Sequence, residues 1–132
     1  MFDTVLVVEN EAYILEAMTA ILDSAGIESF AAKSAKEGVK LFQEHHQEID
    51  LVILDWHLPG EVEGNEVLNR LQAIDPDVKV LISTGYDVRV IQERLGKTTT
   101  AVSILRKPYN AQTLLNAVQQ EMRRDGGCTL SA

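Results

Sequence analysis

Short, continuous apolar runs recur along the chain, and segments with helical spacing separate them. Residues 5–8 and 51–54 contain only Val, Ile and Leu, and residues 78–82 are interrupted by a single lysine. Runs this short and apolar are typical of strands buried on both faces of a parallel sheet. Residues 27–31 and 102–105 include polar positions, so we expect these two strands at the edges of the sheet.

Between and after these runs, apolar residues repeat every three or four positions, as they do in amphipathic helices. The five sets are Ala12, Leu15, Met18, Leu22 and Ala25; Val39 and Phe42; Val67, Leu68, Leu71 and Ile74; Val88, Ile91 and Leu95; and Leu114, Leu115, Val118 and Met122. Gly26 marks the end of the first helix, and Asn110 is a cap for the last. Ser34, with a glutamate three positions later, predicts a capping box at the start of the second helix.

The order of elements is strand, helix, repeated five times without an internal linker. Such alternation predicts right-handed crossovers and a parallel sheet with helices on both faces. With the mixed strands at the edges, the strand order becomes 2-1-3-4-5, which is the flavodoxin-like doubly wound α/β fold with five βα units. Ligands of this fold bind at the carboxyl ends of the strands, near the first and third. We expect one domain over residues 1–125 and a short flexible tail at 126–132.

Composition and charge exclude several classes of function. The chain has 132 residues, which suits one domain, and its formal net charge is -8. This charge repels nucleic acids and anionic membranes, so we expect no direct nucleic-acid partner and no membrane insertion. The single cysteine, Cys128, cannot form an internal disulfide, and no apolar run approaches the roughly 18 residues of a membrane span. We expect a soluble cytoplasmic protein without a signal peptide.

Polar residues follow four of the expected strands where ligands would bind. Glu9 and Asn10 follow the first strand, Asp55 the third, Thr84 the fourth and Lys107 the fifth. Carboxylate, amide and backbone oxygens suit a hard cation such as Mg²⁺. A carboxylate beside that cation can attack phosphorus, while a hydroxyl and an ammonium hold the phosphoryl oxygens. The set therefore predicts phosphoryl transfer to Asp55.

With these motifs in order, the chain resembles the receiver domains of bacterial two-component response regulators, the CheY-like superfamily, over nearly its whole length. The segments that carry the resemblance are Val7-Val8-Glu9-Asn10-Glu11, Leu54-Asp55 with Leu58-Pro59-Gly60, Thr84-Gly85 and Lys107-Pro108. It implies that Asp55 is the phosphoacceptor, Thr84 the switch hydroxyl and Lys107 the phosphate-pairing lysine, on a cis Lys-Pro bond.

The same resemblance implies a metal site and a signalling role. Mg²⁺ would be held by Glu9, Asn10, Asp55 and the backbone carbonyl of His57. A histidine kinase or phosphotransfer protein would supply the phosphoryl group, and a downstream effector domain or protein would read the resulting change of shape. The chain would be a signalling domain and not an enzyme in its own right.

Three positions depart from the family pattern. Asn10 stands where the family usually has aspartate, so we expect weaker Mg²⁺ binding. Ile104 stands where many receivers have the switch aromatic, so the usual coupling of that ring to the threonine cannot operate unchanged. The loop at residues 59–64 is one residue longer than the commonest one, and we expect it to bulge.

Two other functions compete with this interpretation. A degenerate receiver, acting as a phosphorylation-independent interaction module, is favoured by Asn10 and Ile104 and opposed by the intact Asp55, Thr84 and Lys107. A flavin or nucleotide carrier on the same fold is opposed by the acidic segment after the first strand, where a glycine-rich phosphate loop would stand.

One further pair of residues invites a metal interpretation. His45 and His46 lie near the end of the second expected helix, but adjacent helical positions face apart. We therefore expect a solvated pair at the helix C-terminus.

Overall fold

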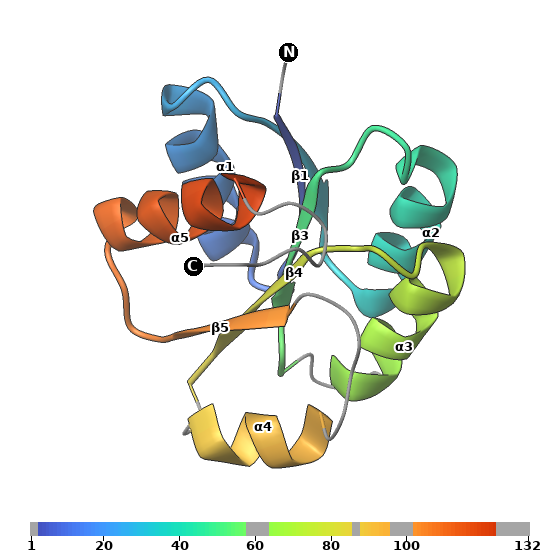
Figure 1. The fold of residues 1–132 in the computed structure, drawn as a ribbon. Helices are drawn as coiled ribbons and strands as arrows, with labels where there is room; N and C mark the ends of the chain where they lie inside the picture. Colours follow the sequence, from blue (N-terminus) through green and yellow to red (C-terminus); the bar gives the residue numbers. More distant parts are fainter. Residues whose placement is uncertain (1–2, 58–63, 86–87, 96–101, 124–132) are drawn as a thin grey trace.

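The structure, a computed structural model, describes residues 3–57, 64–85, 88–95 and 102–123. Five strands and five helices alternate in these residues (Figure 1). The strands are β1 (Thr4–Val8), β2 (Glu28–Ala32), β3 (Leu51–Asp55), β4 (Val80–Thr84) and β5 (Val102–Arg106). The helices are α1 (Ala12–Ser24), α2 (Ala35–His45), α3 (Gly64–Ile74), α4 (Val88–Leu95) and α5 (Ala111–Arg123).

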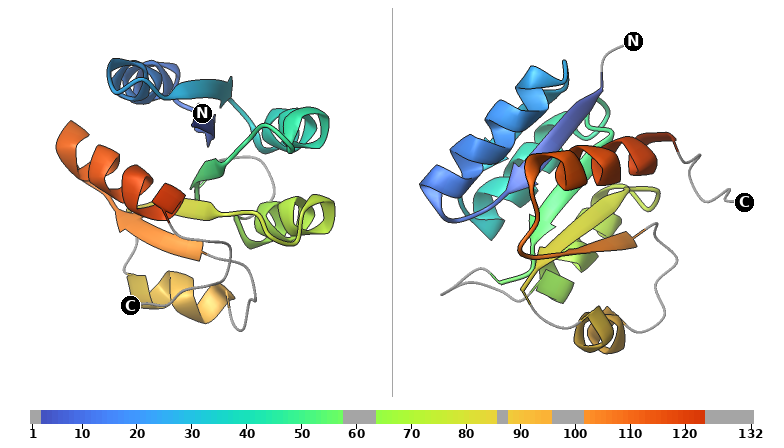
Figure 2. Two further views of the ribbon diagram at one scale, coloured as in Figure 1. Left: turned by 45° about the horizontal axis from the view of Figure 1, so that its top comes forward. Right: turned by 90° about the vertical axis from the view of Figure 1, so that its left-hand side faces the viewer.

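The five strands form one parallel sheet in the order β2-β1-β3-β4-β5, which confirms the predicted flavodoxin-like doubly wound topology. The two strands with mixed sequences, β2 and β5, lie at the edges as expected. Helices α1 and α5 cover one face of the sheet, and α2 and α3 cover the other (Figure 2). The chain therefore folds as a three-layer sandwich with its strand ends gathered at one rim.

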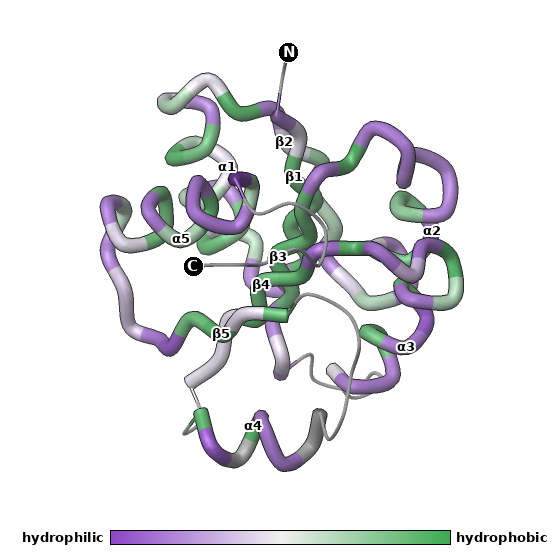
Figure 3. The backbone as a smooth tube through the Cα atoms, in the orientation of Figure 1, coloured by the Kyte–Doolittle hydropathy of each residue, from purple (hydrophilic) through white to green (hydrophobic). Residues whose placement is uncertain are grey.

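The hydrophobic core has two parts, one on each face of the sheet. Along β3, Leu51 and Ile53 pack on the side of α1 and α5, whereas Val52 and Leu54 pack on the side of α2, α3 and α4. This alternation follows from the strand geometry, in which successive side chains point to opposite faces. Figure 3 shows the result, a hydrophobic sheet surrounded by helices of mixed character.

The signals predicted at three helix ends are confirmed. Gly26, after α1, has a φ of 78°, a left-handed conformation that glycine adopts without steric cost. At the start of α2, the Ser34 hydroxyl accepts a hydrogen bond from the N–H of Glu37 at 3.0 Å. At the start of α5, the Asn110 side chain accepts one from the N–H of Thr113 at 2.8 Å.

The prediction that His45 and His46 form a solvated pair at the helix C-terminus holds only in part: His45 lies in the last turn of α2 with 34% of its side chain exposed, but both rings also pack on aromatic residues. The His45 ring stacks on Phe30 with centroids 4.6 Å apart, and the His46 ring lies 5.9 Å from that of Phe42. Both histidines are half-buried because the end of α2 lies against aromatic residues of β2 and of its own preceding turn. They are packing residues at the edge of the core.

Two expectations fall on residues outside the described ones: the bulge of the loop at 59–64, apart from Gly64, and the flexible tail at 126–132. Among the helices that the structure describes, none is long and apolar enough to cross a membrane.

Candidate functional site

The backbone at the carboxyl ends of the central strands is held by hydrogen bonds between neighbouring strands. The N–H of Glu9 donates to the carbonyl of Ala32 at the end of β2. Asp55, the last residue of β3, is in register with Ser83 of β4, and the next N–H, that of Trp56, donates to the Ser83 carbonyl at 3.0 Å. The sheet thus fixes where the Glu9 and Asp55 side chains begin.

Three of the predicted site residues come together at this rim. Lys107 Nζ lies 3.5 Å from Asp55 Oδ1 and 3.7 Å from Glu9 Oε1. Glu9 and Asp55 are 2% and 4% exposed, whereas Lys107 is half-buried. Two covered carboxylates therefore share one ammonium, and that ammonium still reaches the surface.

The environment shifts the pKa of two of these groups. Burial raises the pKa of the Glu9 carboxyl above its ordinary value, and the nearby Asp55 charge adds to the increase. Burial by itself lowers the pKa of the Lys107 ammonium, but the charges of Asp55 and Glu9 outweigh it and raise that pKa overall. The lysine is therefore a permanent cation at neutral pH, and the two carboxylates are held at an electrostatic cost that a further cation would relieve.

Backbone N–H groups orient both carboxylates. The N–H of His57 donates to Asp55 Oδ1 at 3.1 Å, and the N–H of Glu11 donates to Glu9 Oε2 at 3.2 Å. Each bond joins a carboxylate to the residue two positions later, which fixes its orientation within the turn that follows the strand. Glu11 is itself the N-cap residue of α1, so its charge lies at the positive end of that helix.

Thr84 and Lys107 are joined through their backbones. The N–H of Lys107 donates to the Thr84 carbonyl at 2.6 Å, and the Lys107-Pro108 peptide bond is cis, as the resemblance implies. Thr84 is 2% exposed. The Thr84 side chain is therefore covered within the fold.

Two of the three departures from the family pattern, Asn10 and Ile104, fall on residues that the structure describes. Asn10 is exposed, and within the described part of the chain no hydrogen bond or ion pair joins it to Glu9, Asp55 or Lys107. Ile104 is half-buried in β5, opposite Ile82, and packs against the core.

The oxygen donors at the rim fit a hard cation. Within the described ranges, no three His, Cys, Asp or Glu residues group as metal ligands, so an all-protein cage is absent there. Two adjacent carboxylates, with an amide and backbone carbonyls nearby in the chain, suit Mg²⁺, which keeps several of its waters. The set lacks the nitrogen and sulfur ligands that zinc prefers.

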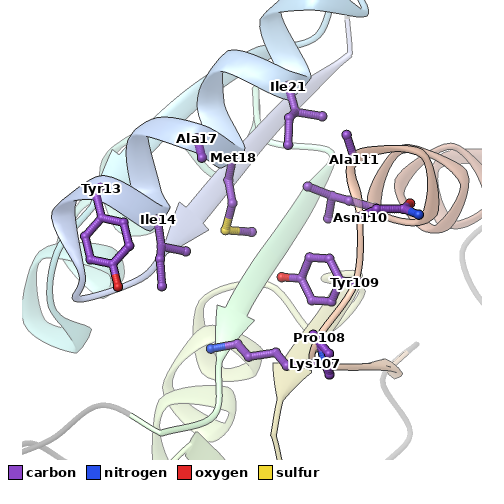
Figure 4. Close-up of a pocket in the computed structure, with 11 residues that line it drawn as sticks. Tyr13, Ile14, Ala17, Met18, Ile21, Lys107, Pro108, Tyr109, Asn110 and Ala111 are labelled. Atoms are coloured by element: carbon purple, nitrogen blue, oxygen red, sulfur yellow. The ribbon is translucent and has the colours of Figure 1, made fainter.

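A neighbouring pair of residues was not predicted from the sequence. The Ser83 hydroxyl is hydrogen-bonded to the Tyr109 hydroxyl at 2.8 Å. Tyr109 and the stem of Lys107 also line a largely apolar cavity of about 380 Å³ between α1 and α5 (Figure 4). The available signals were weak: a serine inside an otherwise apolar strand, and an aromatic residue directly after Lys-Pro.

Comparisons with known proteins agree with this geometry. The model of the response regulator receiver domain matches residues 5–119. The chain is 27% identical over 121 residues to sporulation initiation phosphotransferase F of Bacillus subtilis, covering 91% of this chain and 94% of that protein. It is 29% identical over 127 residues to the phosphate regulon transcriptional regulatory protein PhoB of Pseudomonas aeruginosa, covering 93% of this chain and 53% of that protein.

Solved structures give the same result. A response regulator receiver domain protein from Clostridium thermocellum superposes with a TM-score of 0.80 at 31% identity, covering 92% of this chain and 94% of that one. The chain thus spans nearly all of the phosphotransferase and about half of the transcriptional regulatory protein. With the sheet order, the carboxylate and lysine cluster and the family match in agreement, the chain belongs to the response regulator receiver domain family.

Proposed function

We propose that this chain is the phosphoacceptor domain of a two-component system and that Asp55 accepts the phosphoryl group. The observation that carries the proposal is the 3.5 Å contact between Lys107 Nζ and Asp55 Oδ1 at the rim of the sheet. If Asp55 served only to cap the end of β3, it would not need a lysine from the end of another strand beside it.

The chemistry follows from this arrangement. An Asp55 oxygen attacks the phosphorus of a phosphohistidine or of a small phosphodonor such as acetyl phosphate. A new O–P bond forms, and the bond from phosphorus to the donor imidazole or acetate breaks, with the electron pair leaving on the donor. The Lys107 ammonium neutralises charge on the phosphoryl oxygens, and the Thr84 hydroxyl offers them a hydrogen bond.

Magnesium belongs to the same proposal. The residues that would hold the ion are Glu9, Asn10, Asp55 and, through its backbone carbonyl, His57. When bound, it would supply charge neutralisation beside the attacking carboxylate. The burial of Glu9 and Asp55 beside Lys107 supports a cation here, because adjacent covered carboxylates repel each other.

The partners follow from the family. A histidine kinase or phosphotransfer protein would donate the phosphoryl group, and an effector domain or protein would respond to the phosphorylated form. We place these events in the cytoplasm, since a lone cysteine suits a reducing compartment. The contact between Lys107 and Asp55 opposes the degenerate receiver, which Asn10 and Ile104 favour.

Intact-mass spectrometry with acetyl phosphate and Mg²⁺ tests the proposal. We expect wild type to gain one phosphoryl group and Asp55→Asn to gain none. Asp50→Asn is the matched control, because Asp50 is exposed and precedes the same strand at its opposite end, and we expect normal labelling. Chelation of Mg²⁺ should suppress labelling in wild type and in Asp50→Asn. Equal labelling of Asp55→Asn and wild type would refute the assignment.

A further inference from the structure

Two hydrogen bonds join the end of β4 to the segment that carries Lys107. The first runs from the N–H of Lys107 to the Thr84 carbonyl at 2.6 Å. The second joins the Ser83 and Tyr109 hydroxyls at 2.8 Å. The two bonds lie on either side of Pro108, so the segment is joined to β4 through the backbone of Lys107 and through the side chain of Tyr109.

Ser83 is also tied to the acceptor strand. It is the register partner of Asp55, and its carbonyl accepts the N–H of Trp56 at 3.0 Å. Its exposed fraction is 1%. A single buried residue therefore contacts the strand that bears Asp55 through its backbone and the segment that bears Lys107 through its side chain.

The ring of Tyr109 is held independently of this bond. It packs against the core on the side of α1 and α5 and lines the cavity between these helices, where Figure 4 shows it pointing toward Met18. With the ring packed, the Tyr109 hydroxyl lies within hydrogen-bond distance of the Ser83 hydroxyl. Loss of either hydroxyl would leave the other in a covered position without this bond.

We propose that the hydrogen bond between Ser83 and Tyr109 positions Lys107 against Asp55, so that both are positioning residues for phosphoryl transfer. A lysine ammonium stands on a flexible four-carbon stem, so its location depends strongly on where its backbone is anchored. The inference rests on the proposed function of Asp55 and Lys107.

The test compares initial rates of labelling by saturating acetyl phosphate and Mg²⁺. Tyr109→Phe and Ser83→Ala should each reduce the rate by about two- to tenfold, the usual effect of one hydrogen bond. The double variant should be no slower than the worse single one, because both remove the same bond. Tyr13→Phe is the matched control: it removes an exposed hydroxyl at the same cavity, and the rate should not change.

The Lys107→Ala background separates positioning from a general structural role. If Tyr109 acts through Lys107, Tyr109→Phe will not slow Lys107→Ala further. If Tyr109→Phe reduced the labelling rate by the same factor in wild type and in Lys107→Ala, the inference would be overturned. A wild type that labels at Asp55, with Tyr109→Phe and Ser83→Ala unchanged, would overturn it too while leaving the proposed function intact.

A second readout needs no phosphodonor. The NMR resonances of Lys107 Cε and Nζ report the surroundings of the ammonium directly. They should shift in Tyr109→Phe and Ser83→Ala and remain at their wild-type positions in Tyr13→Phe. Unchanged Lys107 resonances in the first two variants would overturn the positioning role whatever the labelling shows.

Discussion

Lys107 Nζ lies 3.5 Å from Asp55 Oδ1, and this contact joins the residue after β5 to the last residue of β3. The ammonium is 3.7 Å from Glu9 as well, so it stands where it can neutralise both covered carboxylates. About a third of its side chain remains exposed, at 33%. The lysine can therefore contact an incoming anionic group without a rearrangement of the residues around it.

The same contact predicts competition between the ammonium and a metal ion. Lys107→Met removes a positive charge close to both carboxylates, so Mg²⁺ should bind more tightly, by about three- to tenfold after solvent screening. Trp56 follows Asp55 directly, and its fluorescence during a Mg²⁺ titration is the measurement. Lys40→Met, on the exposed side of α2, controls for net charge and should leave the affinity near that of wild type. Weaker binding to Lys107→Met would contradict the prediction.

Position 10 tests the departure from the family pattern. Asn10→Asp adds a carboxylate beside Glu9, and we expect Mg²⁺ to bind about three- to tenfold more tightly, or roughly 1 kcal/mol. The gain is modest because Asn10 is exposed, so that water screens the added charge. The same fluorescence titration measures it. Equal affinities would mean that the side chain at position 10 does not contact the ion.

Gly64 packs against the tryptophan beside the acceptor. A Cβ at this position would overlap Cε3 of the Trp56 ring, and the indole is 6% exposed with little room to move. Gly64→Ala should therefore lower the free energy of unfolding by about 1–3 kcal/mol in urea denaturation. Gly85→Ala, where an added Cβ meets nothing within 4 Å, should change it by less than about 0.5 kcal/mol. Similar losses in the two variants would show that the Trp56 contact is not the cause.

The raised pKa of Tyr109 predicts that the stability of the fold decreases at alkaline pH. Burial raises the pKa of its phenol above the ordinary value of 10.0, and the Ser83 hydrogen bond only partly offsets this. Between that value and the raised one, the folded chain holds a proton that the unfolded chain has lost, so stability decreases as pH rises. The difference in tyrosinate absorbance between wild type and Tyr109→Phe should have its midpoint above pH 10.0. A midpoint at or below 10.0 would show that the phenol is not buried in solution.

Much of the fold could be predicted because its signals are local in the sequence. The apolar run at 51–54 is a buried strand, and the caps at Ser34 and Asn110 hold as expected. The first residues of β2 and β4 were predicted less accurately, because each strand is preceded by a turn. The N–H of Val78 bonds to the Asp75 carbonyl, so β4 begins at Val80. Similarly, the N–H of Ile27 bonds back to α1, so β2 begins at Glu28.

The features that were missed depend on contacts between distant parts of the chain. The bond between Ser83 and Tyr109 needs the register of β4 against the segment after β5, which no local pattern encodes. His45 appeared solvated because its helix position alone did not reveal the Phe30 ring across from it. That Glu9, Asp55 and Lys107 lie together could be predicted because parallel strand ends meet at one edge, whereas their distances and burial came only from the folded chain.

The identity of the acceptor is the central claim, and peptide mapping tests it most directly. After labelling with acetyl phosphate and Mg²⁺, borohydride reduction cleaves an aspartyl phosphate and leaves homoserine in its place. Tandem mass spectrometry of the digested chain should then locate homoserine at position 55 and at no other aspartate. Homoserine at another aspartate, with Asp55 unchanged, would contradict the account.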